Sequence, residues 1–93
     1  ALKNSNYKIT IVDFHAKWCG PCKIIGRDYE RLSQDAKYSA VQFLKVDVDE
    51  AEDVAVLCEI SAMPTFQVFR DGKKCDQLVG ASVDKLIALL DKN

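Results

Sequence analysis

The sequence predicts an α/β fold, in which a central β-sheet carries helices on both faces. Segments rich in β-branched residues alternate with segments of helical periodicity, in the order strand, helix, strand, helix, strand, strand, helix. An Asp-Gly pair separates the last two strand segments, which is typical of a tight hairpin. With 93 residues the chain is long enough for one hydrophobic core, so we expect residues 1–93 to form a single domain.

The N-terminal part of the chain is predicted to contain a strand and then a helix, with Cys19 between them. The segment KITIVDF, residues 8–14, alternates its side chains and is rich in β-branched residues, which predicts a strand. Helical spacing of apolar residues then predicts a helix from about Gly20 to about Lys37. Its buried stripe is expected to comprise Cys22, Ile25, Tyr29, Leu32 and Ala36.

The middle of the chain contains a second strand and a short helix. The segment VQFLKVDVD, residues 41–49, is apolar on both faces around Leu44 and Val46, which favours a central and mostly parallel strand. Asp49 and Glu52 have the spacing of a capping box, so a short helix is expected to begin there. Its inner stripe is expected to include Val54, Leu57 and Cys58.

The C-terminal part is predicted to be a hairpin followed by a helix. The segment MPTFQVFRDGKKCDQLVG, residues 63–80, reads as two strands joined by a turn at Asp71-Gly72. Ser82 is a good N-cap for the last helix, and Lys92 near the C-terminal end suits the helix dipole. The apolar positions of this helix are Val83, Leu86, Ile87 and Leu90.

Composition and charge exclude several classes of protein. The net charge is -1, from 13 basic and 14 acidic residues that are interspersed, so no basic face for nucleic acid or a membrane surface is predicted. Apolar residues make up 48% and charged residues 29%, which is typical of a globular domain. No apolar run approaches ~20 residues and the start, ALKNSNYK, lacks the features of a targeting segment, so a cytoplasmic location is expected.

The stretch WCGPCK, residues 18–23, points to redox chemistry. Cys19 is at the start of the predicted helix, where unpaired N–H groups and the helix dipole favour a thiolate. Pro21 suits the first helical position, because its φ is already helical. Cys22 lies one turn later on the apolar stripe, so we expect it to be buried and Cys19 to be accessible. Such a pair can perform disulfide exchange, in which Cys19 attacks a disulfide and Cys22 resolves the mixed disulfide.

Two structural interpretations of the cysteine pair are less consistent with the sequence. A closed zinc site needs about four ligands, whereas this chain has one C-x-x-C pair and a single histidine, His15. A purely structural disulfide between Cys19 and Cys22 would close a very short loop, so it would stabilise the fold little on a chain-entropy account. Redox exchange without a metal is therefore the preferred interpretation.

The motifs together resemble those of the thioredoxin family over nearly the whole chain. VDF, WCGPCK, KVDVDE, SAMPTF, the DG turn and LVGAS follow one another in the order and at the spacing of that family. The resemblance implies a thioredoxin-like fold, with a mixed sheet of about four strands, and the activity of a protein-disulfide reductase. It also implies a domain without a cofactor, which carries electrons from NADPH, through a separate thioredoxin reductase, to disulfide-containing clients in cell redox homeostasis.

The resemblance also implies roles for individual residues. Asp13 corresponds to a buried carboxylate beneath the disulfide and Lys45 to the lysine near it, so burial should raise the pKa of Asp13 and Lys45 should oppose that rise. Such a carboxylate can take a proton from Cys22; the alternative is that Asp13 only ends a strand. Pro64 corresponds to a cis proline that faces the disulfide. The substrate-binding groove is expected to comprise Trp18, Gly20, Pro21, Met63, Pro64, Gly80 and Ala81.

Three features depart from the family pattern. Gly26-Arg27 stand where a proline is usual, so a kink there is expected to be weak or to come from Gly26. His15 replaces an aromatic residue and either packs as a flat ring or tunes the Cys19 thiolate through its charge. ALKNSNY can be at most the tail of the family's first helix, so we expect either that the sequence is a shortened form of the domain or that the usual first strand is missing. The sheet edge that this exposes would favour dimers or lower stability.

Cys58 and Cys75 lie outside the WCGPCK motif, and two functions other than disulfide reduction are alternatives for the chain. Cys58 is expected to be a small core residue, whereas Cys75, beside two lysines on an edge strand, is expected to be exposed and to form intermolecular disulfides. The alternative function is a binding module, in which the groove holds a partner and the dithiol is incidental. An isomerase-like domain of a secretory compartment is less consistent with the sequence, since Gly20-Pro21 resembles the reducing members of the family and no retention signal is visible.

Overall fold

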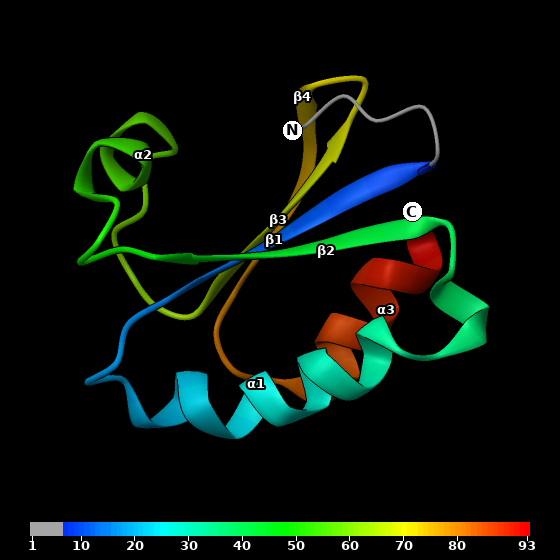
Figure 1. Cartoon of the computed structure of the whole chain (residues 1–93), viewed down its shortest axis with the longest axis horizontal. Coiled ribbons are helices and arrows are strands. Elements are labelled where there is room, and N and C mark those ends of the chain that lie inside the picture. The colour runs from blue at the N-terminus through cyan, green and yellow to red at the C-terminus, as the bar shows by residue number, and fades with distance from the viewer. Residues whose placement is uncertain (1–6) are drawn as a thin grey trace.

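The computed structural model describes residues 7–93, which form a four-stranded sheet with three α-helices and one short 3-10 helix (Figure 1). The strands are β1 (Ile9–His15), β2 (Val41–Asp47), β3 (Thr65–Arg70) and β4 (Lys73–Val79). The helices are α1 (Gly20–Ser33), η1 (Ala36–Tyr38), α2 (Glu52–Leu57) and α3 (Val83–Lys92). The predicted order of strands and α-helices is therefore confirmed.

The sheet is mixed and has the strand order β2-β1-β3-β4. β1 runs parallel to β2 and antiparallel to β3, and β3 and β4 form an antiparallel hairpin. The prediction that residues 41–49 form a central strand was wrong. Within residues 7–93, β2 lies at an edge and ends at Asp47, and its residues are mostly half-buried because β1 takes the central place.

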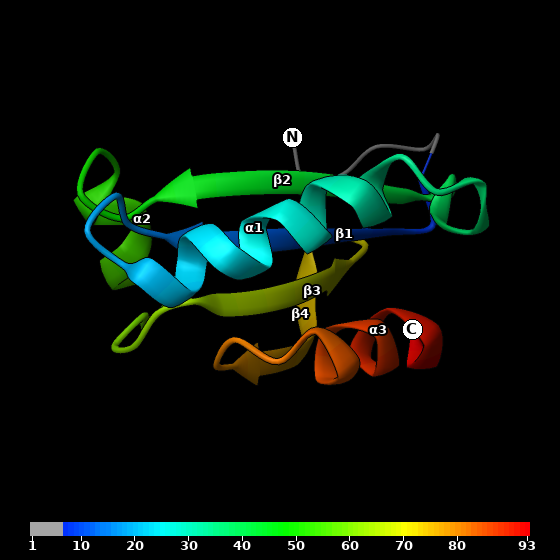
Figure 2. The same cartoon turned by 90° about the horizontal axis from the view of Figure 1, so that it is seen from below.

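Helices α1 and α3 pack on the same face of the sheet and enclose the main hydrophobic core (Figure 2). Alternate side chains of β1 and β3 point into this core, where Ile11 and Phe66 are inaccessible to solvent. Tyr29 of α1 is buried beside Phe66, and its single O–H is shared between the carbonyl oxygens of Ile11 and Leu44, which lie 3.0 and 2.7 Å from the hydroxyl oxygen. This one side chain therefore ties α1 to both parallel strands.

Helix α1 is shorter than predicted. It ends at Ser33 rather than at Lys37, and a 3-10 turn follows it. The side chain of Asp35 accepts a hydrogen bond from the backbone N–H of Lys37 at 2.9 Å and so caps this turn. Because the cap starts a new element, Ala36 leaves the buried stripe on which the prediction placed it, and is exposed.

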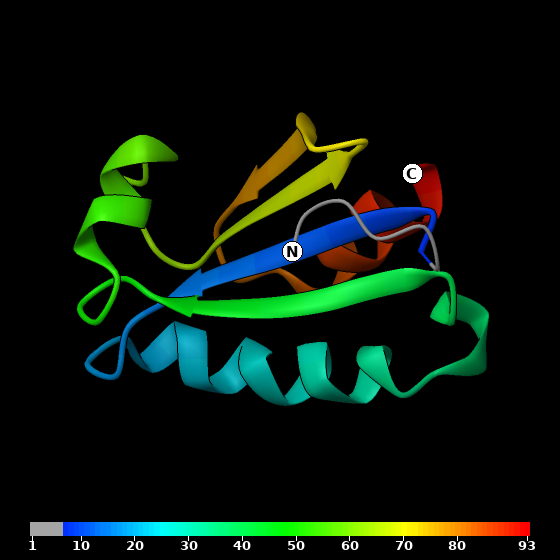
Figure 3. The ribbon, with the colours of Figure 1, turned by 45° about the horizontal axis from the view of Figure 1, so that its top comes forward.

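The start of helix α2 also differs from the prediction. Its N-cap is Ala51, which makes no side-chain hydrogen bond, so the expected capping box of Asp49 and Glu52 does not form. The helix lies beyond the end of β2, away from the layer formed by α1 and α3 (Figure 3). Asp49 instead stays in the turn between β2 and α2, where its side chain is available for another contact.

The buried face of α2 is not the predicted one. Val54 and Leu57 were expected to point inward, but both are exposed, and Ala55 is the buried residue of this helix. Cys58 is half-buried at the C-cap. A helix of six residues is too short to be oriented by its own apolar pattern, so the turns on either side decide which face is covered.

The C-terminal hairpin and helix agree with the prediction. Asp71 and Gly72 have positive φ values of 55° and 79°, as the central residues of a hairpin turn require. Ser82 is the N-cap of α3, and its hydroxyl accepts a hydrogen bond from the backbone N–H of Lys85 at 3.3 Å. Lys92 lies in the last turn of α3, near the negative end of the helix dipole.

Two further points concern the surface and the N-terminus. None of the helices within residues 7–93 has the length and apolar character needed to cross a membrane. The expectation that ALKNSNY is the tail of a helix falls on residues 1–6, which lie outside the described part of the chain, and on Tyr7, which is not helical. Dimers formed through the edge at β2 stay a prediction.

Candidate active site

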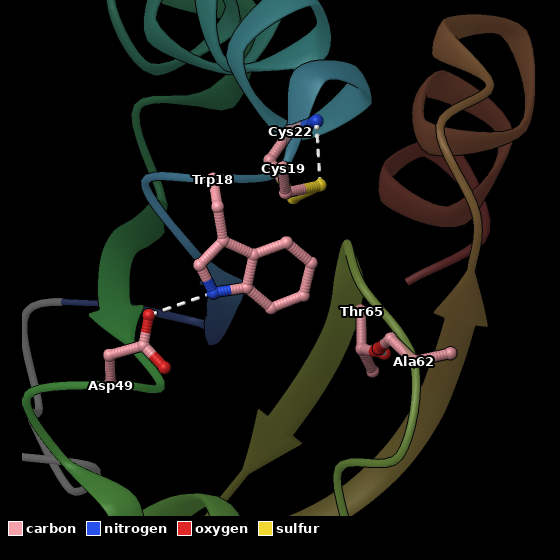
Figure 4. The surroundings of a disulfide bond; sticks show 6 residues. All are labelled: Trp18, Cys19, Cys22, Asp49, Ala62 and Thr65. Carbon is pink, nitrogen blue, oxygen red and sulfur yellow. Dashed lines mark hydrogen bonds between the residues drawn. A yellow bond between two sulfur atoms is a disulfide. The ribbon is translucent and has the colours of Figure 1, made fainter.

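Cys19 and Cys22 form a disulfide at the N-terminus of α1, with their Cα atoms 5.3 Å apart (Figure 4). Cys19 is the N-cap of α1, and its Sγ accepts a hydrogen bond from the backbone N–H of Cys22 at 3.2 Å. This donor and the positive end of the helix dipole both stabilise negative charge on the Cys19 sulfur. The predicted place of Cys19 at the helix start is thus confirmed. Pro21 occupies the second helical position rather than the first.

The two cysteines are equally buried in the oxidised form. Cys19 exposes 6% of its surface and Cys22 exposes 5%, because Ala16, Val48 and Met63 pack around the pair. The prediction that Cys22 is buried is confirmed, whereas the prediction that Cys19 is accessible was wrong for this form. The two sulfurs differ in their position on the helix, since only Cys19 stands at its end.

Trp18 lies beside the disulfide and is 68% exposed. Its indole Nε1–H donates a hydrogen bond to Asp49 Oδ2 at 2.9 Å, which holds the ring toward the end of β2 (Figure 4). Asp47 accepts a hydrogen bond from the backbone N–H of Asp49 at 2.9 Å and so shapes this turn. This contact could not be predicted from the sequence, because only the parallel pairing of β1 with β2 brings residue 49 next to residue 18.

The loop before β3 lies near the disulfide (Figure 4). The peptide bond between Met63 and Pro64 is cis, as the resemblance implies. Pro64 is fully buried, and its carbonyl oxygen accepts a hydrogen bond from the backbone N–H of Gly80 at 3.0 Å. Within the same loop, the Thr65 hydroxyl donates a hydrogen bond to the carbonyl oxygen of Ala62 at 2.6 Å. These two hydrogen bonds hold the loop in place between β3 and the end of β4.

The expected groove residues are of two kinds. Met63 packs directly on the cysteine pair and Pro64 is buried beneath the surface, so both hold the site together. Gly80 has a φ of 114°, which favours glycine, and no atom lies within 4 Å of where a Cβ would be. The remaining groove residues are exposed and therefore available to a ligand: Trp18, Gly20, Pro21 and Ala81.

Asp13 is a buried carboxyl group in the central strand. It is only 2% exposed, and its Oδ1 has no hydrogen-bond partner within residues 7–93. Burial raises the pKa of Asp13 from 3.8 to about 6, and the charge of Lys45, its register partner on β2, works in the opposite direction. The two expected effects are therefore confirmed. Asp13 does not end its strand, because β1 continues to His15.

A pocket of about 570 Å³ opens beside α1 and connects Asp13 with Cys22. Half-buried His15 is part of its wall, as is Gly26, where an added Cβ would have no neighbour within 4 Å. Helix α1 continues through Gly26 and Arg27 without interruption, so the helix is not broken at the position where the family usually has a proline. Each of these residues could be identified from the sequence separately, but only the tertiary structure shows that they share a cavity.

The remaining cysteines are not part of this site. Cys75 is exposed on β4, as predicted, with its Sγ 3.8 Å from Asn93 Oδ1. Cys58 is half-buried rather than a core residue, and its carbonyl oxygen accepts a hydrogen bond from Gln67 Nε2 at 3.0 Å. Among the described residues, no three His, Cys, Asp or Glu side chains are grouped in a way that could hold a metal ion.

Comparison with known proteins assigns the chain to a family. The family model for thioredoxin matches residues 1–92. The chain belongs to the thioredoxin family. Thioredoxin from Equus caballus is 50% identical to it over 90 residues, which cover 97% of this chain and 84% of the relative.

Solved thioredoxin structures share the fold of this protein. Plasmodium falciparum thioredoxin superposes with a TM-score of 0.88 at 44% identity, covering 95% of this chain and 84% of the other. Mitochondrial thioredoxin 3 from Saccharomyces cerevisiae gives a TM-score of 0.86 at 38% identity, covering 94% and 80%. The predicted thioredoxin-like fold is therefore confirmed.

Family membership and the Cys19–Cys22 pair establish the activity of this thioredoxin. The protein is a thiol–disulfide oxidoreductase that reduces protein disulfides. Thioredoxins need no cofactor, and their partners in general are disulfide-containing substrates and thioredoxin reductase. A binding module with an incidental dithiol finds no support in these comparisons.

Proposed function

We propose that Cys19 is the nucleophile of this thioredoxin, that Cys22 is the resolving thiol and that Asp13 accepts the proton of Cys22. The observation that supports this assignment is the N-cap position of Cys19, with the Cys22 N–H donating to its sulfur at 3.2 Å. A hydrogen bond to the charged form and the helix dipole both lower the pKa of a thiol. Cys22, inside the first turn, is placed to attack second.

The reaction has two exchange steps. The Cys19 thiolate attacks one sulfur of the client disulfide, the client S–S bond breaks, and the other client sulfur leaves as a thiolate and is protonated. Cys22 then loses its proton and attacks the Cys19 sulfur, which expels the second client sulfur. The client gains two electrons and becomes a dithiol, while Cys19 and Cys22 are oxidised to the disulfide seen in the structure.

Asp13 is suited to the proton transfer that precedes the second step. It lines the same pocket as Cys22, and its pKa of about 6 leaves it largely ionised at neutral pH but able to bind a proton at modest cost. The charge of Lys45 prevents a larger rise of this pKa. Water entering the pocket can carry the proton between Cys22 and the carboxylate.

The client is expected to bind next to the disulfide, on the side of Trp18 and the cis-proline loop. An extended client segment can form backbone hydrogen bonds beside Met63, in the manner of a strand added to an edge. The exposed ring of Trp18, held by Asp49, offers apolar surface at one side of this segment. The binding residues in this proposal are Trp18, Gly20, Pro21, Met63, Pro64, Gly80 and Ala81.

The proposal extends to the cellular setting. A separate thioredoxin reductase would supply electrons from NADPH, and the protein would act as a single-domain electron carrier in cell redox homeostasis. We propose the cytoplasm as its location, although the Saccharomyces cerevisiae relative is mitochondrial. The protein would act as a monomer, with dimers formed through Cys75 or through the edge at β2.

The experiment that tests the assignment is reduction of insulin disulfides, with dithiothreitol as the electron donor. The intact chain should accelerate the reduction, and Cys19→Ser should abolish the acceleration. In a separate incubation without dithiothreitol, pre-reduced Cys22→Ser should retain the first step and accumulate a mixed disulfide with insulin, visible on a non-reducing gel. If Cys22→Ser accumulated no adduct and Cys19→Ser did, the roles of the two cysteines would have to be exchanged.

A further inference from the structure

The pocket beside α1 contains positive charge that the reaction does not use. Lys23 and Arg27 both line it, and neither forms an ion pair within residues 7–93. Two like charges at positions i and i+4 of a helix repel each other. An anion placed between these side chains would remove that repulsion.

Apart from the buried Asp13, the other charged side chains of the pocket already form ion pairs. Glu30, at its rim, forms an ion pair with Lys45 at 3.6 Å. Lys17 forms an ion pair at 3.4 Å with Glu50, which does not line the pocket. The Asp13 carboxyl group lies in the depth and would repel an anion there, so the free positive charge is at the mouth. The ligand that fits is a single carboxylate at the mouth, which a guanidinium can bind with two hydrogen bonds.

The room for this ligand depends on Gly26, which lies between Lys23 and Arg27 on the same helix. Gly26 lines the pocket without a side chain, and a Cβ added there would have no atom within 4 Å. A large side chain at this position would therefore occupy space that a ligand can use. A change at Gly26 also leaves every charge of the pocket in place.

The position of the pocket indicates where the carboxylate comes from. Cys22 forms part of its wall, so the pocket begins directly beside the disulfide that reacts with clients. A carboxylate on a bound client would be present at an effective concentration of about millimolar, which suits an open and weak site. A free acid has no such advantage.

We propose that this pocket is a specificity site, in which Lys23 and Arg27 bind an acidic side chain of the client while its disulfide is reduced. The inference rests on the proposed function and deepens it, because it names the client class: disulfides with Asp or Glu close to the attacked cysteine. Lys23 and Arg27 act here on recognition and take no part in the sulfur chemistry.

The test uses two disulfide-bonded peptides that differ only in Glu or Gln residues beside one cysteine. The pre-reduced full chain should reduce the Glu peptide faster in single turnover, by roughly threefold, as expected for an exposed ion pair of this kind. Lys23→Gln and Arg27→Gln should each lower this rate ratio toward one. Lys85→Gln is the matched control, because Lys85 is an exposed lysine on α3 that forms no ion pair within residues 7–93, and its ratio should equal that of the parent chain.

A second variant separates binding in the pocket from long-range attraction. Gly26→Leu keeps the charges but fills the cavity, so the ratio should fall if the carboxylate enters the pocket. An unchanged ratio would mean that Lys23 and Arg27 only steer the peptide, and the specificity site would be withdrawn. Gly26→Met serves the same purpose if the leucine variant is not folded by circular dichroism.

The remaining outcomes are also decisive. If the parent chain reduced neither peptide, the proposed function would fail; if it reduced both at equal rates, that function would stand and the specificity site would be wrong. Free glutarate, added at constant ionic strength, should lower the ratio of the Glu-peptide rate to the Gln-peptide rate only at about millimolar concentrations. That is the effective concentration expected for the carboxylate of a bound client. Loss of the preference at far lower glutarate would assign the pocket to a free dicarboxylic acid and overturn the client proposal.

Discussion

Helices α1 and α2 each follow one of the two parallel strands, yet the protein holds them very differently. α1 starts with a side-chain cap from Cys19 and buries four residues, one of which, Tyr29, shares its O–H between carbonyl oxygens of two strands. α2 has no side-chain cap and buries only Ala55, while its Leu57 is 82% exposed. Of these two helices, the reactive disulfide is therefore on the one that tertiary contacts fix more firmly, which keeps the sulfurs in one geometry.

The largest difference between the two helices should appear when an apolar side chain is removed from each. Tyr29→Ala should lower the free energy of unfolding by about 3–5 kcal/mol, because it leaves a cavity in the core. Leu57→Ala should change it by no more than about 0.5 kcal/mol, since the side chain is already in solvent. Urea unfolding measures both. Similar losses of unfolding free energy in the two alanine variants would show that α2 is held as firmly as α1. Tyr29→Phe is the control that keeps the ring, and it should lower the free energy of unfolding by only about 1–2 kcal/mol.

Asp13, which lies beneath α1, should give the next largest effect. Its pKa rises from 3.8 to about 6 on folding, so the folded state binds a proton more tightly, and stability falls as the pH rises through this interval. The loss is complete above pH 6 and absent below pH 4. Asp13→Asn removes the charge, so it should raise the free energy of unfolding by about 2–3 kcal/mol at pH 7.5 and by little at pH 3.5.

Urea unfolding at both pH values measures this effect. Asp53→Asn on α2 is the matched control, because Asp53 is exposed, and it should show no comparable gain at either pH. A gain for Asp13→Asn that is equal at pH 3.5 and pH 7.5 would assign the stabilisation to a cause other than the buried charge.

Gly26→Ala should stabilise α1 by about 1 kcal/mol. Glycine in a helix interior costs roughly that amount relative to alanine, and the added methyl group would meet no atom within 4 Å. Thermal unfolding followed by circular dichroism would detect the higher melting temperature. A lower melting temperature would mean that the backbone of α1 at this point requires glycine for a reason other than space.

The smallest effect should come from giving α2 the cap that it lacks. Ala51→Ser places a hydroxyl at the N-cap and should stabilise the protein by about 0.5 kcal/mol, at the low end for caps, since the φ and ψ of Ala51, -129° and 58°, are not those of a typical N-cap. Removing the existing cap of α3 by Ser82→Ala should cost about 1 kcal/mol. If Ala51→Ser raised the free energy of unfolding by as much as Ser82→Ala lowered it, the lack of an N-cap alone would account for the weak attachment of α2.

The agreement between sequence and structure follows the length of each element. The bounds of β1 and the start of α1 were predicted closely, although α1 ends four residues earlier than predicted. The Asp71-Gly72 turn and the Ser82 cap were located by residue type alone. The buried face of α2 was wrong, because Val54 and Leu57 satisfy a helical pattern that six residues are too few to enforce.

The site shows the same division. The place of Cys19 at a helix start could be predicted, since it depends on one element and its immediate neighbours, and the burial of Asp13 was implied by the family resemblance. The hydrogen bond between Trp18 and Asp49 could not, because it needs the pairing of β1 with β2. The burial of Cys19 also depends on a distant residue, Met63, which packs against the disulfide.

The sequence by itself determined the order of strands and helices, the cysteine pair at the first turn of α1 and the likeness to thioredoxins, because periodicity, caps and motifs are properties of neighbouring residues. Only the tertiary structure decided that β2 lies at the edge in the described part of the chain and that Lys23, Gly26 and Arg27 face one pocket with Asp13. These features arise where separate elements meet, and the packing of their side chains selects one arrangement among those that each local pattern allows.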